Sequence, residues 1–147
     1  MIIAVGNDHA GFELKNILIR HLKERGYETV DCGAYDDKSC DYPDFAKKAA
    51  EEVVSGRAEK GLLICGTGIG MCIAANKIKG IRAAVVTEEF SAEATRSHND
   101  ANILCLGARV TDPEKAVKLL DIFLDTPFSE GENHKRRIEK IRMIEKG

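Results

Sequence analysis

Short runs of Ile, Val and Leu, bordered by glycines, recur along the chain. Four of them occupy residues 2–6, 60–66, 82–86 and 103–107. Continuous apolar runs of this length are typical of strands that are buried on both faces of a parallel sheet. A weaker run at residues 27–33 alternates between apolar and polar positions. This alternation predicts a strand at an edge of the same sheet.

Helical patterns separate the predicted strands. Leu14, Leu18 and Leu22 fall on one helical face, and Gly26 is placed to end that helix. An alanine-rich face that starts near Pro43 predicts the next helix. Later helices are predicted at residues 70–77, 91–96 and 113–124. The alternation of strands and helices predicts an α/β fold, with helices on both sides of a five-stranded parallel sheet.

The last segment, residues 134–146, carries isoleucines at every third position. Ile138, Ile141 and Ile144 are separated by charged residues, a pattern that predicts one further helix. The five-strand unit does not obviously require this helix. It can pack on its own domain or on a second subunit, and the pattern favours neither.

Length and composition limit the possible classes of protein. A chain of 147 residues with 44% hydrophobic residues fits a single domain, residues 1–147, with one ordinary core. The 22 basic residues do not exceed the 24 acidic ones, so no net basic field predicts nucleic-acid binding. Five cysteines without close pairing indicate reduced thiols. No apolar run approaches the roughly 18 residues that span a membrane, and we expect a cytoplasmic protein.

Two glycine-rich turns follow predicted strands, where ligands bind in open parallel sheets. They are residues 6–11 and 65–70, and the second contains Gly66, Gly68 and Gly70. Each turn can bind an anion through backbone N–H groups, or can simply be a tight connection. Phe12 stands where a nucleotide-triphosphate loop needs lysine, and Met71 stands where a dinucleotide fingerprint needs glycine. Both cofactor classes are disfavoured, and no cysteine or histidine pair has the spacing of a zinc site.

Chemically reactive side chains also fall near predicted strand ends. Cys65 lies at a predicted helix start, a position that can favour a thiolate, whereas Cys32, Cys72 and Cys105 are expected to be packing residues. Six other side chains adjoin strands or lie at the start of the last helix. They are His9 beside Asp8, His98 beside Asn99, and the pair His134 and Arg137 on one helical face. Such a gathering of histidine, aspartate and cysteine at strand ends predicts a catalytic site.

An ordered set of motifs resembles the B-type ribose-5-phosphate isomerases and the related galactose-6-phosphate isomerase subunits. The motifs are Asn7-Asp-His-Ala-Gly11, Asp41-Tyr-Pro43, Cys65-Gly-Thr-Gly-Ile-Gly70, Ala75-Asn-Lys77, Gly80-Ile-Arg82, Ser97-His-Asn-Asp100, Ala101-Asn102 and His134-Lys-Arg-Arg-Ile138. The resemblance runs nearly from end to end. It implies a Rossmann-like three-layer α/β/α fold with an extra C-terminal helix and no metal or other cofactor. It also implies a homodimer or dimer of dimers, with sites shared between subunits.

The resemblance also assigns roles to residues in a sugar-phosphate site. It implies that Cys65 is the base that moves a proton between two carbons, that Thr67 moves a proton between the sugar oxygens, and that His98 opens the ring. The amides of Gly66, Gly68 and Gly70 would hold an enediolate oxygen. Asp8, Tyr42 and Asn99 would position the sugar, and His9, Arg109, His134 and Arg137 would bind its phosphate. Asn133 departs from the family pattern, which commonly has arginine there, so either Arg136 compensates or phosphate binding is weaker.

Three functions remain compatible with these residues. The first is interconversion of ribose 5-phosphate and ribulose 5-phosphate through an enediolate. The second is isomerisation of a hexose phosphate, galactose 6-phosphate or allose 6-phosphate, which pocket depth would decide. The third, a non-catalytic phosphosugar-binding protein, would not require Cys65, Thr67 and His98 together.

Overall fold

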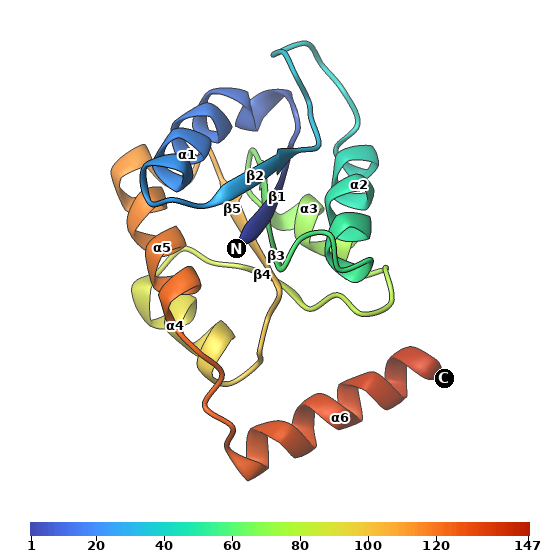
Figure 1. Cartoon of the computed structure of the whole chain (residues 1–147). Coiled ribbons are helices and arrows are strands. Elements are labelled where there is room, and N and C mark those ends of the chain that lie inside the picture. Colours follow the sequence, from blue (N-terminus) through green and yellow to red (C-terminus); the bar gives the residue numbers. More distant parts are fainter.

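Five parallel strands form the central sheet of the computed structural model, which describes all residues from 1 to 147. The strands are β1 (Ile2–Asn7), β2 (Glu28–Asp31), β3 (Lys60–Cys65), β4 (Ala83–Val85) and β5 (Ile103–Gly107). Their order across the sheet is β2-β1-β3-β5-β4 (Figure 1). All four neighbouring pairs are parallel, as the alternation of strands and helices predicted.

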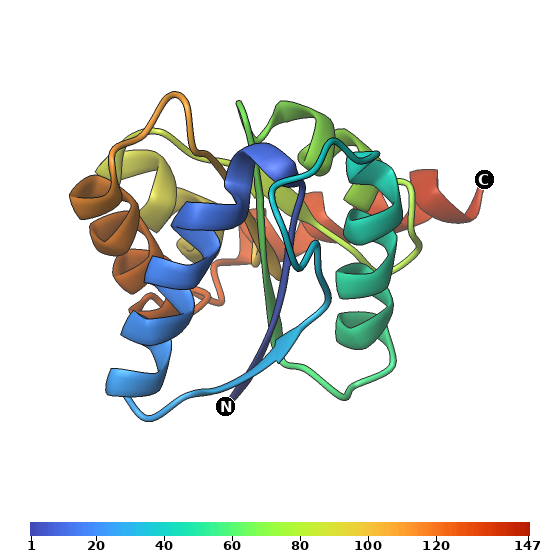
Figure 2. The same ribbon diagram turned by 90° about the horizontal axis from the view of Figure 1, so that it is seen from above.

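Helices cover both faces of this sheet, which makes the three-layer α/β/α fold (Figure 2). The helices are α1 (Phe12–Glu24), α2 (Tyr42–Val54), α3 (Ile69–Ala75), α4 (Glu89–Ser97), α5 (Pro113–Asp125) and α6 (Glu132–Lys146), and a short 3-10 helix η1 (His9–Gly11) precedes α1. α1, α4 and α5 pack on one face, and α2 and α3 pack on the other. None of these helices combines the length and the apolar character that a membrane span needs.

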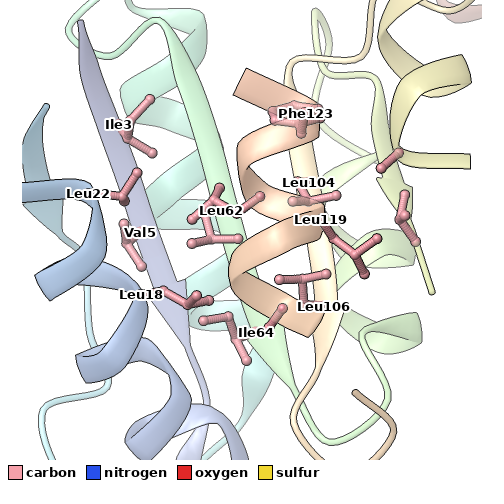
Figure 3. Packing of buried hydrophobic residues seen from close by; sticks show 14 of the residues in the cluster. Ile3, Val5, Leu18, Leu22, Leu62, Ile64, Leu104, Leu106, Leu119 and Phe123 are labelled. Carbon is pink, nitrogen blue, oxygen red and sulfur yellow. The ribbon is translucent and has the colours of Figure 1, made fainter. Parts of the chain in front are cut away.

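The larger core lies between the sheet and the layer formed by α1, α4 and α5. Alternate residues of the three inner strands point into it, because successive side chains of a strand face opposite sides of the sheet. They are Ile3, Val5, Leu62, Ile64, Leu104 and Leu106, and they meet Leu18, Leu22, Leu119 and Phe123 (Figure 3). The leucine spacing of α1 is therefore a core-facing stripe.

The second core lies beneath α2 and α3 and consists largely of small side chains. Ala46, Ala49 and Ala50 bring the backbone of α2 close to the sheet, where they meet Ala4 and Leu63. The three inner strands are thus buried on both sides, which explains their continuous apolar runs.

Strand β4 departs from the sequence-based prediction of a strand buried on both faces. It pairs only with β5, and its residues are partly exposed. It is therefore the second edge of the sheet, opposite β2, whose edge position was predicted correctly. The error arises because an apolar run reports side-chain character and does not report how many neighbouring strands will pair with it.

The connections after β1 and β3 leave the sheet in opposite directions. The chain passes from β1 into α1 on one face and from β3 into α3 on the other face. Because β1 and β3 are neighbours, their carboxyl ends form a topological switch point, the position at which open parallel sheets bind ligands. The fold therefore brings the two glycine-rich turns together.

Helix α6 extends away from the sandwich and follows neither layer (Figure 1). Only Ile138 of its apolar stripe is buried, with 4% of its surface exposed, whereas Ile141 is 46% and Ile144 is 79% exposed. Most of the stripe is thus left uncovered by its own domain.

Candidate active site

The end of β1 places an aspartate and a histidine at this switch point. Asp8 is buried and caps η1, where its Oδ1 accepts hydrogen bonds from the N–H groups of Ala10 at 2.9 Å and Gly11 at 3.2 Å. His9 follows, and its Nδ1 accepts a hydrogen bond from the Cys40 N–H at 3.3 Å. This bond makes Nδ1 the acceptor, so the neutral ring carries its proton on Nε2, which is free to donate to a ligand.

The end of β3 holds a thiol inside a turn of backbone N–H groups. Cys65 is the last residue of the strand and is only 5% exposed. Its Sγ accepts a hydrogen bond from the Gly68 N–H at 3.1 Å, and the Thr67 hydroxyl oxygen accepts one from the Ile69 N–H at 3.2 Å. Gly68 has a φ of 80°, in the left-handed region that glycine occupies without penalty. The turn thus folds back over the sulfur.

The end of β5 and the two residues that follow it hold this turn in place. The Ala108 N–H donates to the Cys65 carbonyl oxygen at 2.8 Å, and the Arg109 N–H donates to the Gly66 carbonyl oxygen at 3.0 Å. A side chain at Gly107 would place its Cβ 2.5 Å from the carbonyl carbon of Thr67, so only glycine permits this approach. The arrangement puts the Arg109 guanidinium beside Gly66, 3.2 Å from where a Cβ would stand.

Tyr42, at the start of α2, contacts the turn that follows β3. A Cβ at Gly70 would lie 2.6 Å from Cζ of the tyrosine ring, so the ring rests directly on that glycine. The carboxyl edge of the sheet therefore gathers nine of the predicted site residues: Asp8, His9, Tyr42, Cys65, Gly66, Thr67, Gly68, Gly70 and Arg109. We call this group the thiol half-site.

The other four predicted site residues form a second group. His98 directly follows α4, and its ring stacks on that of His134 from α6, with centroids 4.4 Å apart and planes 10° apart. Partial desolvation lowers the pKa of His134 below its ordinary value, and the nearby charges of His98 and Arg137 lower it further. Asn99 follows His98 directly. We call His98, Asn99, His134 and Arg137 the histidine half-site.

Within one chain the two half-sites lie at opposite ends of the strands, the thiol half-site at their carboxyl ends and the histidine half-site at their amino ends. Helix α4 starts after β4 and ends before β5, so His98 is at the amino edge. Asn102 accepts a hydrogen bond there from the N–H of Gly61, near the start of β3. From Gly61 to Cys65 the strand advances about 13 Å at about 3.3 Å per residue. The predicted convergence at strand ends therefore holds for Asp8, His9 and Cys65 and does not include His98 of the same chain.

The remaining cysteines differ from one another. Burial raises the pKa of Cys32 to about 11 and that of Cys105 well above its ordinary value, in agreement with packing roles. Cys72 is half-buried, and a hydrogen bond from Cys105 lowers its pKa to about 7. Its Sγ also donates a hydrogen bond to the Ala83 carbonyl oxygen at 3.4 Å. No three Cys, His, Asp or Glu side chains are grouped as metal ligands would be.

Comparisons with known proteins show which family the chain resembles. The sequence model of the Ribose/Galactose Isomerase family matches residues 3–141. Ribose-5-phosphate isomerase B of Escherichia coli K12 is 46% identical over 143 residues, which cover 97% of this chain and 95% of that protein. The structure of Clostridium thermocellum ribose-5-phosphate isomerase B has a TM-score of 0.98 and 49% identity, and the match covers 99% of this chain and 98% of that one.

A third relative was solved with a ligand. The structure of ribose-5-phosphate isomerase B from Mycoplasma genitalium with bound ribulose-5-phosphate has a TM-score of 0.93 and 44% identity. The match covers 99% of this chain and 96% of that one. Because the family model spans nearly the whole sequence and the full-length relatives share the fold, this chain belongs to the ribose/galactose isomerase family.

Proposed function

We propose that the protein interconverts ribose 5-phosphate and ribulose 5-phosphate. The observation that carries this proposal is the thiol half-site, where a nearly buried cysteine sits in a turn of N–H donors beside a guanidinium. Isomerisation moves one proton between neighbouring carbons and needs a base and fixed donors for the developing negative charge. No net oxidation or reduction of the sugar occurs.

Proton transfer would take place at Cys65. Its thiolate removes the proton from C2 of the open aldose, and the electron pair moves into an enediolate. The thiol then returns a proton to C1, which gives the ketose. The Thr67 hydroxyl would move a proton between the two sugar oxygens, while the amides of Gly66, Gly68 and Gly70 stabilise the enediolate oxygen.

The remaining residues of the thiol half-site would hold the substrate. Asp8 uses Oδ1 for capping, which leaves Oδ2 for a sugar hydroxyl, and Tyr42 offers its hydroxyl from the opposite wall. His9 and Arg109 would bind the phosphate. The Nε2 proton of His9 and the guanidinium of Arg109 are both donors that suit phosphate oxygens.

A second chain would supply the histidine half-site. Within a single chain this half-site lies at the amino ends of the strands, whereas the thiol half-site lies at their carboxyl ends. Exposed apolar residues support this assembly. Ile69 and Ile73 of α3 are 54% and 59% exposed beside the Cys65 turn, and Ile141 and Ile144 of α6 are also uncovered. Pairing these surfaces in a two-fold dimer would bury both and bring His98 to the partner's thiol half-site. We therefore propose a homodimer, alone or paired into a dimer of dimers.

The first turns of α6 would add positive charge at the phosphate. His134 and Arg137 would contact it directly. Asn133 stands where related proteins commonly have arginine, but its Oδ1 accepts a hydrogen bond from Nη1 of Arg136 at 3.0 Å. A guanidinium is thus held beside that position, and we propose that Arg136 compensates for the missing arginine.

A turnover assay tests the proposed reaction. Purified protein is offered ribose 5-phosphate, galactose 6-phosphate and allose 6-phosphate in parallel, and the ketose products are quantified. We expect ribulose 5-phosphate to form with the highest kcat/KM of the three reactions. Faster conversion of a hexose phosphate would reassign the substrate, and binding of all three sugars without turnover would mean a non-catalytic protein.

Replacing His98 with asparagine should separate ring opening from proton transfer. Ribose 5-phosphate is largely cyclic and needs an acid-base group to open it, whereas ribulose 5-phosphate is already open. Turnover of ribose 5-phosphate should fall about 100- to 10,000-fold, as expected for a lost acid-base group. Exchange of the C1 protons of ribulose 5-phosphate with deuterated solvent, followed by NMR, should fall much less. Equal losses in both reactions would contradict this division of roles.

A further inference from the structure

Two arginines donate hydrogen bonds to three successive backbone carbonyl oxygens next to His98. Arg82 lies just before β4, and its Nε and Nη2 donate to the carbonyl oxygens of Asn99 and Asp100, both at 2.9 Å. Arg96 lies in the last turn of α4, and its Nη1 donates to the carbonyl oxygen of Ala101 at 2.7 Å. The loop that carries Asn99 is thus held by side chains from two different elements.

The carboxylate of Asp100 lies between the two guanidiniums. Its Oδ1 accepts from Nη1 of Arg96 at 2.8 Å, and its Oδ2 lies 3.4 Å from Nη2 of Arg82. Asp100 has a φ of 47°, in the left-handed region that side chains other than glycine, asparagine and aspartate rarely adopt. The loop is therefore held in an unusual conformation by a network of charged hydrogen bonds.

This network is also anchored to the part of the chain that leads into α6. The Arg96 side chain is buried, and its Nε donates to the Thr126 carbonyl oxygen at 3.1 Å. The Ser129 N–H donates to the Ser97 carbonyl oxygen at 3.1 Å. Because α6 carries His134, these bonds fix the two elements whose histidine rings stack.

We propose that Arg82, Arg96 and Asp100 act as a positioning clamp that holds His98 and Asn99 for the reaction. The proposal rests on the proposed function, because it deepens the role of His98 there. None of the three clamp residues needs to touch the sugar. Their effect passes through the backbone of residues 98–101, since charged hydrogen bonds to successive carbonyls leave that backbone one conformation.

Two substitutions of Asp100 separate the carboxylate from the backbone conformation. Asp100→Gly keeps the left-handed φ without strain and removes the carboxylate, whereas Asp100→Asn keeps an acceptor for Arg96 and tolerates the same φ. A clamp predicts activity in the order Asp, Asn, Gly. A purely conformational role predicts that glycine performs as well as aspartate.

Kinetics and NMR together give the readouts. For Asp100→Gly we expect kcat/KM for ribose 5-phosphate to fall on the order of 100-fold, the effect of a misplaced catalytic group. Deuterium exchange at C1 of ribulose 5-phosphate should fall much less, because the thiol half-site is untouched. The nuclear Overhauser contact between the His98 and His134 rings should weaken in Asp100→Gly and survive in Asp100→Asn.

A matched control uses Glu130, the other residue besides glycine that has a positive φ, 63°. Its carboxylate pairs with Lys135 at 3.1 Å and takes no part in the clamp. Glu130→Gly should keep wild-type turnover and the contact between the histidine rings. If Asp100→Gly does not fold, Arg82→Lys takes its place, because lysine keeps the charge and cannot span two carbonyls.

Three outcomes would overturn the clamp. They are wild-type kcat/KM in Asp100→Gly, an equal loss of both reactions, or an unchanged contact between the histidine rings in that variant. If the proposed function itself is wrong, the wild-type protein will not convert ribose 5-phosphate, and this result distinguishes the two failures. The NMR measurement still decides in that case whether the clamp holds His98.

Discussion

Replacing Cys65 with alanine is expected to abolish isomerisation while ribose 5-phosphate still binds. The thiol is the only group in the thiol half-site that we assign to proton removal from carbon, and its loss should lower kcat by about 100- to 10,000-fold. His9 and Arg109 remain in place to hold the phosphate. Turnover assays should therefore show the loss in kcat, and calorimetric titration should show substrate affinity near that of the wild type.

Cys72→Ala is the matched control for this variant. Cys72 is a half-buried thiol on α3, the helix that follows the Cys65 turn, and it lies outside both half-sites. Its replacement should lower thermal stability slightly and leave kcat largely unchanged. Near-normal turnover by Cys65→Ala, or a comparable loss in Cys72→Ala, would remove Cys65 from the role of base.

Much of the fold follows directly from residue patterns. The alternate positions Ile3 and Val5 face one core while Ala4 faces the other, so the run had to be apolar throughout. The same reasoning applies to the strands that contain Leu62 and Leu104. Strand order was less accessible to sequence reasoning, because pairing depends on which faces the helices take. This is why the exposed edge position of β4 was missed.

Buried charge also escaped the sequence analysis. Lys15 is almost completely buried in α1, where its Nζ donates to the Ala34 carbonyl oxygen at 2.6 Å and pairs with Asp31 at 3.1 Å. A lysine in an amphipathic helix normally indicates the solvent side. Its partners lie 16 and 19 residues away, so only the folded chain reveals that they can compensate the buried charge.

Part of the candidate site could be predicted from its position relative to the strands. Asp8 and His9 directly follow β1, and Cys65 is the last residue of β3. Because the carboxyl ends of parallel strands lie together, the grouping of these residues could be predicted. His98 precedes a strand and therefore lies near the amino ends of the strands. The clamp could not be predicted from the sequence, because Arg96 and Asp100 have the spacing of an ordinary surface ion pair on a helix. Their burial and the contribution of Arg82 appear only in three dimensions.

Two inactive variants should restore activity when they share a dimer. Cys65→Ala removes the base from the thiol half-site of its chain, and Arg137→Ala removes a phosphate contact from the histidine half-site of its chain. If each active site combines one half-site from each chain, a mixed dimer has one site with both defects and one intact site. Neither variant alone has an intact site.

This complementation tests most directly the claim that isomerisation occurs in a site built from two chains. The variants are mixed in equal amounts, dissociated and reassembled, with subunit exchange verified by mass-tagged chains. Random pairing makes half of the dimers mixed, so about a quarter of the wild-type activity on ribose 5-phosphate should return. No recovery after verified exchange would place Cys65 and Arg137 in the same chain's site and contradict the two-chain account.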